Sequence, residues 1–361
     1  MRVVQVPLGG RSYSISIGSN QLGRIGKKCL QLGLRGRGAI ISDENVAPHF
    51  AQRVITTLKM AGFDPALITI PSGEKSKNLR TVQDCYSRLA AQRFERKSFI
   101  IALGGGVVGD VAGFIAATYL RGIPFIQIPT TLLAQVDSSV GGKVGVNLPA
   151  GKNLVGAFYQ PRWVLCDLET LRTLPEREFR AGLAEVFKYG IIYDRRLFAQ
   201  LERDLPKILQ RDPKILSTVI ARCCEIKAEV VAEDETESGR RAILNFGHTI
   251  GHALEAISGY GKYLHGEAIS IGQVAAARIS TLETGLPVAE AVRIEKLFQR
   301  AGLPTRIDLS SALKTKLWRA MQVDKKVSRG EIKFVLAHKI GKVSWGKKVS
   351  SEVIDRSLWP D

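Results

Sequence analysis

The sequence predicts two successive parts, an α/β N-terminal domain with a mostly parallel, Rossmann-like sheet and an all-α C-terminal domain. Short apolar runs alternate with amphipathic segments in the first half, while long amphipathic segments fill most of the second. A glycine-rich turn also follows a buried apolar run in the first half. Because 361 residues exceed what one compact core usually supports, we expect two domains, 1–176 and 177–361.

The expected strands of the first half are short runs rich in Ile, Val and Phe, and the chain already begins as a strand at Met1. They cover residues 12–17, 39–42, 67–70, 99–103, 125–129 and 163–166. Helical segments separate several of them, at 45–60, 79–92 and 111–119. This alternation is typical of a parallel sheet with helices on its faces.

The second half is predicted to be helical. Amphipathic periodicity covers residues 179–193, 213–233, 249–257, 267–284, 288–301 and 313–322. Apolar residues alternate late in the chain, at 332–336 and 342–345, which indicates a small hairpin.

Composition excludes several classes of protein. With 45% apolar and 24% charged residues the chain can bury a sizeable core, yet no run approaches the length of a membrane span, and the N-terminus has no signal-peptide pattern. The five cysteines are scattered without metal spacing, so we expect reduced thiols in a cytoplasmic protein without a membrane partner.

The formal net charge of +18 raises the question of nucleic-acid binding. The basic residues are dispersed along the whole chain, without an aromatic-interleaved binding module. We therefore expect no nucleic-acid partner. Part of the charge would serve a site for anionic ligands, and the remainder has no specific explanation in the sequence.

Residues 104–110 (GGGVVGD) read as a turn after the strand at 99–103, with a helix following from Val111. Glycines let backbone N–H groups approach a pyrophosphate, and a helix N-terminus favours its charge. The pattern alone is weak, because such turns often only pack a helix on a strand, and residues 127–131 lack the usual ribose-binding acid. Asp43 closes an earlier strand and would supply that carboxylate if both strands end at the same sheet edge.

Three of the five histidines, His248, His252 and His265, fall in one short window. They are either structural residues at helix ends or ligands of a divalent metal. Imidazoles one helical turn apart share a helix face, so spacing makes His248 and His252 the natural pair. Glu185 is the best candidate for a carboxylate ligand, with Lys188 on the next turn of the same face.

Taken together, these motifs closely resemble the 3-dehydroquinate synthase family of the sugar-phosphate cyclase superfamily. The resemblance is ordered along nearly the whole chain. Its segments are 72–77 (SGEKSK), 104–110, 129–143 (PTTLLAQVDSSVGGK), 152–153 (KN), 171–178 (LRTLPERE), 184–190 (AEVFKYG), 245–252 (NFGHTIGH) and 265–267 (HGE).

The resemblance changes the metal assignment that spacing favours. It implies that Glu185, His248 and His265 hold one Zn²⁺ or Co²⁺ ion, and that His252 is not a ligand. An open coordination position would then accept substrate hydroxyls, as a catalytic Lewis acid requires.

The resemblance also assigns two ligand sets. NAD contacts are implied for Ser72, Gly73, Glu74, Lys75, Ser76, Lys77, Gly105, Gly106, Val107, Val108, Gly109, Asp110, Thr130, Thr131, Lys143, Lys152, Thr170, Leu171, Arg172 and Thr173, to which the sheet-edge argument adds Asp43. Catalytic or substrate contacts are implied for Asp137, Lys143, Asn153, Lys188, Lys227, Arg241, Asn245 and His252, and Arg121 would reach the phosphate across a homodimer interface.

The implied activity is that of an NAD- and metal-dependent carbon–oxygen lyase of the shikimate pathway, which leads to the aromatic amino acids. It converts 3-deoxy-D-arabino-heptulosonate 7-phosphate to 3-dehydroquinate and phosphate by transient oxidation, phosphate elimination, re-reduction and intramolecular aldol closure. Residues 1–176 would bind NAD and 177–361 the metal and substrate, with the site between them.

Three alternatives remain open at this stage. A cyclase of the 2-deoxy-scyllo-inosose synthase type acts on a substrate without a carboxylate, so the cations Lys227 and Arg241 argue against it. A metal-dependent polyol dehydrogenase would not need the cluster that includes Lys143, Lys152 and Asn153. A nucleotide-binding regulatory protein would not need an open metal position. The sequence does not decide the metal, or which of Lys325 and Lys326 turns toward the phosphate.

Overall fold

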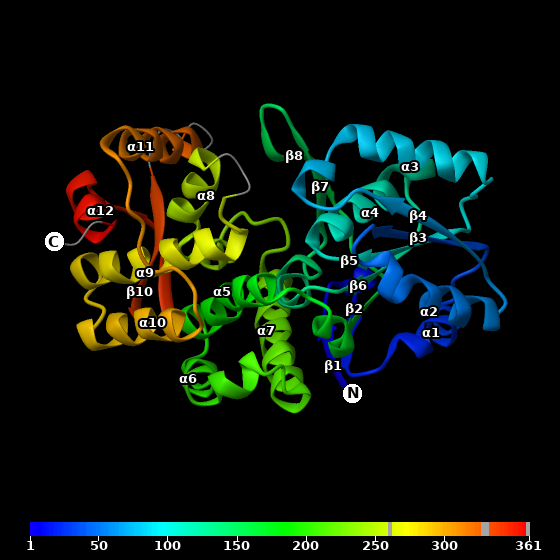
Figure 1. Cartoon of the computed structure of the whole chain (residues 1–361), viewed down its shortest axis with the longest axis horizontal. Coiled ribbons are helices and arrows are strands. Elements are labelled where there is room, and N and C mark those ends of the chain that lie inside the picture. The colour runs from blue at the N-terminus through cyan, green and yellow to red at the C-terminus, as the bar shows by residue number, and fades with distance from the viewer. Residues whose placement is uncertain (259–261, 326–331, 359–361) are drawn as a thin grey trace. The chain divides into compact units, whose positions relative to one another are not determined.

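The computed structural model of the chain describes residues 1–258, 262–325 and 332–358, which fold into two compact units (Figure 1). The first unit comprises Met1–Leu174 and Leu216–Ala232, and the second comprises Pro175–Ile215 and Glu233–Asp361. Each unit is described by itself. Lys326 lies outside the described residues, and Lys325 is described only as the last residue of its helix.

The first unit is built on a seven-stranded sheet of order β1-β2-β9-β6-β5-β3-β4. Its strands are β1 (Arg2–Val6), β2 (Tyr13–Gly18), β3 (Arg37–Asp43), β4 (Asp64–Ile70), β5 (Phe99–Gly104), β6 (Phe125–Pro129) and β9 (Trp163–Asp167). Within this sheet, which lies in the described part of the chain, the β1–β2 pair is antiparallel and the other pairs are parallel. The predicted mostly parallel α/β fold and its strands are therefore confirmed.

Two helical layers cover the sheet, with α1 (Ile25–Gln31) and α2 (Ala47–Met60) on one face and α3 (Leu79–Ala91) and α4 (Gly106–Thr118) on the other (Figure 1). Successive strand residues point to opposite faces. Ile40 and Ile101 accordingly pack in the core beneath α1 and α2, whereas Ile41 and Ile100 pack beneath α3 and α4.

The glycine-rich turn is shorter than the sequence predicts. Helix α4 begins at Gly106 instead of Val111, with Gly105 as its N-cap residue. Residues 107–110 therefore belong to the first turns of the helix. A Cβ at Gly104 would lie 2.6 Å from Val108 Cγ2, so this glycine allows the helix to begin directly against its own strand.

An antiparallel hairpin, which the sequence did not predict, follows: β7 (Lys143–Leu148) and β8 (Gly151–Phe158). Gly145 and Gly156 are directly opposite in the register. A Cβ at Gly145 would lie 2.5 Å from the Val155 carbonyl oxygen, and a Cβ at Gly156 would lie 2.4 Å from the Val144 carbonyl oxygen. Glycines that the close backbone approach requires weaken the strand pattern in the sequence.

Short helical turns complete the first unit. They are η1 (Gly9–Arg11), η2 (Leu22–Arg24), η3 (Glu74–Ser76), η4 (Tyr119–Arg121), the π-helical η5 (Ala134–Ser138) and η6 (Leu168–Arg172).

The second unit is mainly helical, as predicted. Its elements are α5 (Glu176–Ile192), α6 (Arg195–Leu209), the ends of α7 (Pro213–Glu233), η7 (Arg240–Asn245), α8 (His248–Ile257), α9 (His265–Glu283), α10 (Val288–Arg300), α11 (Ser311–Lys325) and α12 (Ser351–Leu358). The predicted hairpin is present as β10 (Lys333–Lys339) and β11 (Lys342–Lys348). Its Phe334 and Leu336 pack with Ile250 and Leu254 of α8. Helices α6 and α12 were not predicted.

Most of α7 belongs to the first unit, although the sequence-based division at 176/177 assigns it to the second. Two buried side chains explain the difference. Cys224 donates its thiol to the Gln135 carbonyl at 3.3 Å, and Lys227 Nζ donates to Asp137 Oδ1 at 2.8 Å. None of the described helices combines the length and the apolar character that crossing a membrane requires.

Candidate functional site

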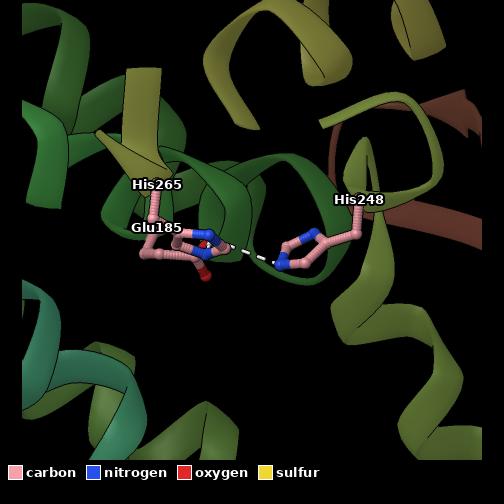
Figure 2. Close-up of side chains that lie close together, drawn as sticks. All are labelled: Glu185, His248 and His265. Carbon is pink, nitrogen blue, oxygen red and sulfur yellow. Dashed lines mark ion pairs between the residues drawn. The ribbon is translucent and has the colours of Figure 1, made fainter. Parts of the chain in front are cut away.

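Three side chains from separate helices meet in the second unit: Glu185 of α5, His248 of α8 and His265 of α9 (Figure 2). Their ligand atoms lie within 4.8 Å of one another. Nε2 of His248 is 3.5 Å from Glu185 Oε1, and Nε2 of His265 is 3.9 Å from the same oxygen. One carboxylate oxygen and two imidazole nitrogens therefore face a common point.

Local backbone features fix the two histidines. His248 is the first residue of α8 and follows Gly247, whose φ is +80°. A Cβ at Gly247 would lie 2.5 Å from the backbone nitrogen of Gln273, so only glycine fits there. His265 begins α9, where Glu267 accepts a hydrogen bond from the Leu264 N–H at 2.9 Å.

Glu185 is fully buried, and its two oxygens have different surroundings. Oε2 accepts from Lys188 Nζ, also buried. Oε1, which faces the two histidines, accepts no hydrogen bond from the described residues. A buried carboxylate oxygen without a donor is costly, and a bound cation would compensate for it. The donor set thus fits a divalent metal with mixed nitrogen and oxygen ligands.

The opposite ring nitrogen of each histidine has an acceptor. His248 Nδ1 lies 3.2 Å from the Phe246 carbonyl, and His265 Nδ1 lies 3.2 Å from Glu255 Oε2. Because a carbonyl oxygen can only accept, the proton of neutral His248 sits on Nδ1 and leaves an Nε2 lone pair toward Glu185. Burial lowers the pKa of His248 well below its usual value, and the charge of Lys188 adds to this effect. A neutral imidazole is the form that binds metals.

His252 lies beside this cluster. Its ring centroid is 5.2 Å from that of His248 and 6.0 Å from that of His265. Its nitrogens do not group with Glu185, but with Glu255 and His265 in a second set of possible ligands. Spacing alone would have paired His248 with His252, whereas the geometry groups Glu185, His248 and His265, as the resemblance implies.

The segment before α8 holds two predicted substrate residues of the second unit. Arg241 is almost fully buried and its Nη1 donates to the Glu235 carbonyl, while Asn245 Nδ2 donates to Glu237 Oε1 at 2.9 Å. Asp234 closes the loop by accepting backbone N–H groups from Gly239 and Arg241 at 2.8 and 2.9 Å. Sequence reasoning did not identify Asp234 or Glu237, because nothing in the pattern shows which acids fold back on this loop.

In the first unit, the predicted cofactor residues gather at the carboxyl ends of the parallel strands. Ser42 pairs with Leu103 in the β3–β5 register, so Asp43 and Gly104 lie side by side at one sheet edge. The predicted common edge is confirmed. The chain continues from β3 to β4 on one side and from β5 to β6 on the other, so the strand order reverses between β3 and β5. Parallel α/β sheets bind ligands at such a switch point.

The other predicted cofactor segments follow neighbouring strands at the same edge. Residues 72–77 come after β4, residues 105–110 begin α4 after β5, Thr130 and Thr131 come after β6, and residues 170–173 follow β9. Thr130 Oγ1 is buried and finds no partner in the described part of the chain. The Thr130 backbone N–H donates to the Gly104 carbonyl at 3.0 Å, so this residue lies next to the glycine-rich segment that precedes α4. An orphaned hydroxyl next to a helix N-terminus fits a phosphate-bearing ligand.

Lys77, a predicted cofactor residue, contacts a second predicted cofactor residue and a predicted substrate residue. Nζ of Lys77 donates to the Asp110 carboxylate and, at 2.5 Å, to Asn153 Oδ1. Burial raises the pKa of Asp110, although the Lys77 charge opposes that shift. The end of the β7–β8 hairpin is also bound to this segment, since Asn147 Nδ2 donates to Glu74 Oε1 at 2.7 Å.

The other predicted substrate and cofactor residues of the first unit lie on several elements. Asp137, in the π-helical turn, is paired with Lys227, whose side chain is almost buried. Lys143 is an exposed residue at the start of β7, and half-buried Lys152 lies near the start of β8. Arg121 is exposed in η4 and has a positive φ of 69°.

Two family models together match most of the chain. Residues 67–181 match the model of the 3-dehydroquinate synthase N-terminal domain, and residues 182–327 match that of the C-terminal domain. The chain belongs to the 3-dehydroquinate synthase family. A 3-dehydroquinate synthase of Pelobacter propionicus is 52% identical over 344 residues, which cover 94% of this chain and 94% of that protein.

Solved structures of related cyclases are similar over almost the full length of this 3-dehydroquinate synthase family member. A 2-deoxy-scyllo-inosose synthase in complex with carbaglucose-6-phosphate, NAD⁺ and Co²⁺ has a TM-score of 0.89 at 29% identity and covers 99% of both chains. A 2-epi-5-epi-valiolone synthase from Streptomyces hygroscopicus with NAD⁺ and Zn²⁺ has a TM-score of 0.88 at 26% identity, covering 99% of this chain and 98% of that one.

Proposed function

We propose that this protein is a 3-dehydroquinate synthase, which converts 3-deoxy-D-arabino-heptulosonate 7-phosphate to 3-dehydroquinate and phosphate. The observation that supports this proposal most strongly is the cluster of Glu185, His248 and His265. The chain that contains it is 52% identical to a protein named 3-dehydroquinate synthase. Relatives named as other cyclases share only 29% and 26% of their residues, which makes those activities weaker candidates.

Glu185, His248 and His265 would hold one Zn²⁺ or Co²⁺ ion, which supplies Lewis acidity for a substrate hydroxyl. The buried Lys188 and Glu185 fix each other in place. His252 is exposed beside the cluster, where its imidazole would orient a hydroxyl or move a proton.

The carboxyl edge of the sheet would hold NAD, which supplies reversible hydride transfer. The N–H groups that begin α4 and the hydroxyl of Thr130 would bind its pyrophosphate. Oδ1 of Asp43 already accepts hydrogen bonds from the backbone N–H groups of Asn45 and Val46. Its Oδ2 would accept a hydrogen bond from a ribose hydroxyl.

Basic side chains would bind the anionic substrate. A dianionic phosphate and a carboxylate require several, and Lys143, Lys227 and Arg241 are the proposed ones. Asp137 holds Lys227 through two hydrogen bonds, to its carbonyl and its carboxylate. These contacts fix the ammonium group before any ligand binds.

We further propose a cytoplasmic homodimer in which Arg121 reaches the partner's substrate, and no nucleic-acid or membrane partner. All five cysteines, which lie within the described ranges, are buried and form no disulfide, in keeping with a reducing compartment.

A product assay tests the function. Purified protein is supplied with the heptulosonate phosphate and NAD⁺, and phosphate release and NADH absorbance are followed together. Because the cofactor is regenerated in each turnover, phosphate should accumulate in proportion to dehydroquinate, without lasting NADH. Net NADH formation without phosphate release would support a polyol dehydrogenase instead. Turnover of glucose 6-phosphate in place of the heptulosonate would support the inosose synthase activity.

A further inference from the structure

We propose that Glu255 is a positioning residue that orients His265 for metal binding and strengthens its Nε2 as a donor. The inference rests on the proposed metal centre, and it assigns a role to a residue outside the predicted ligand and substrate sets. Glu255 lies in α8, and its side chain is only 8% exposed. Its Oε2 lies 3.2 Å from His265 Nδ1.

Close packing of α8 on α9 brings the two residues together. Gly251 lies one helical turn before Glu255, and a Cβ there would come within 3.1 Å of Ile269 Cα and 3.2 Å of the Ala268 carbonyl oxygen. Glycine thus lets the two helices approach, and Glu255 then reaches the first residue of α9. The contact is built into the helix pair and does not depend on a flexible surface side chain.

The chemistry follows from the two nitrogens of the ring. An ionised carboxylate can only accept, so Glu255 selects the tautomer of neutral His265 that carries its proton on Nδ1. The Nε2 lone pair is then left on the side of Glu185, 3.9 Å from its Oε1. A carboxylate on the far nitrogen also raises the basicity of an imidazole ligand.

The Nδ1 atoms of His248 and His265 have different kinds of hydrogen-bond acceptor. The acceptor for His248 Nδ1 is the backbone carbonyl of Phe246, which no substitution removes. The acceptor for His265 is a side chain. Glu255 is therefore the place where ligand orientation can be changed without altering a proposed ligand.

A competing possibility is that His252, Glu255 and His265, whose ligand atoms also group together, hold an ion of their own. In that case Glu255 would be a ligand and the protein would bind two ions. One ion per chain is expected if Glu255 acts only through His265, so metal stoichiometry separates the two roles.

The test uses full-length metal-free protein and compares wild type with Glu255→Gln and Glu255→Asp. The matched control is Glu295→Gln, which removes a half-buried carboxylate bound to Arg278 in the same unit. Zn²⁺ affinity is measured by competition with a chelating dye, and the visible spectrum of the Co²⁺ form reports ligand geometry. The apo-protein Tm is recorded for every variant.

We expect wild type and the control to bind one ion with equal affinity. Glu255→Gln should raise the Kd about 10- to 100-fold, the usual cost of losing such a partner, and shift the Co²⁺ spectrum. Glu255→Asp should lie between them, because it keeps the carboxylate on a shorter side chain. The apo Tm of both variants should stay near that of the control.

An unchanged Kd in Glu255→Gln would overturn the inference and leave the metal centre intact. The inference would also be overturned if the wild-type protein bound two ions per chain and Glu255→Gln bound only one. If the apo Tm and the affinity fall together in both variants, Glu255 acts in packing and the inference is wrong. A wild-type protein that binds no Zn²⁺ or Co²⁺ would instead refute the proposed metal centre itself.

Discussion

Lys188 donates to Glu185 from the next turn of α5, and the two side chains are among the most deeply buried charges in the described part of the chain. The lysine compensates the carboxylate when no cation is bound at Oε1. Removing one partner of a buried pair leaves the other charge uncompensated.

Lys188→Met should therefore lower the free energy of unfolding of the metal-free protein by about 3–5 kcal/mol. The gain in Tm on adding Zn²⁺ should exceed that of wild type, because the ion no longer shares the carboxylate with an ammonium group. Denaturant titration with and without Zn²⁺ measures both effects. Lys207→Met, at an exposed position of α6, is the control and should change neither value. Equal unfolding free energies in the two variants would contradict the prediction.

The two histidines one turn apart in α8 should behave differently. His248→Ala removes a proposed ligand and should weaken metal binding at least about tenfold. His252→Ala should retain its metal and lose about 10²–10⁴ in kcat, the range for a group that transfers a proton or orients a hydroxyl. Metal content measured beside kcat distinguishes them. Equal metal loss in both variants would mean that both imidazoles coordinate the ion.

Metal removal should abolish turnover reversibly. Dialysis against a strong chelator should eliminate activity, and Zn²⁺ or Co²⁺ should restore it, because one carboxylate and two imidazoles suit either ion. Mg²⁺ serves as the control, since it prefers oxygen ligands and should not restore activity. Full turnover by protein shown to be metal-free by elemental analysis would refute this expectation.

Asp234 should make an acid-sensitive contribution to stability. Burial raises its pKa, but the backbone N–H groups of Arg241, Ser238 and Gly239 outweigh that effect and lower the pKa to about 2. A carboxyl with a lowered folded-state pKa stabilises the fold above its unfolded pKa of about 4, and this contribution is lost as the pH falls toward 2.

The Tm difference between wild type and Asp234→Asn should accordingly be constant from pH 7 to 5 and shrink below pH 4. Asp308→Asn, at an exposed position, should show no such pattern. A difference that stays constant down to pH 3 would show that Asp234 does not act through its charge. Because Asp234 closes the loop of Arg241, its variant should also lose activity at neutral pH.

The parallel sheet could be predicted from sequence because strands buried on both faces read as continuous apolar runs, as at residues 99–103. The β7–β8 hairpin could not, because Gly145 and Gly156 are required by backbone contact and carry no strand signal. The start of α4 was placed five residues late, since glycines read as a turn whether or not they are helical.

The candidate site divides in the same way. Glu185 and the histidines were identifiable because such residues are rare in apolar helices. The acceptors that orient the two histidines could not be identified from the sequence. The Phe246 carbonyl belongs to the backbone, and Glu255 resembles any other acidic residue on a helix face. Only the fold shows which nitrogen of each ring is bound.

The contact of Lys77 with both Asp110 and Asn153 limits how kinetic data on this protein can be interpreted. One ammonium group joins a residue of α4 to the end of a hairpin, so any substitution of Lys77 perturbs two proposed functions at once. Effects of residues that share a partner are not additive. Changes in KM for NAD⁺ and for substrate can be apportioned only by a double-mutant cycle in which Asn153 and Lys77 are replaced singly and together.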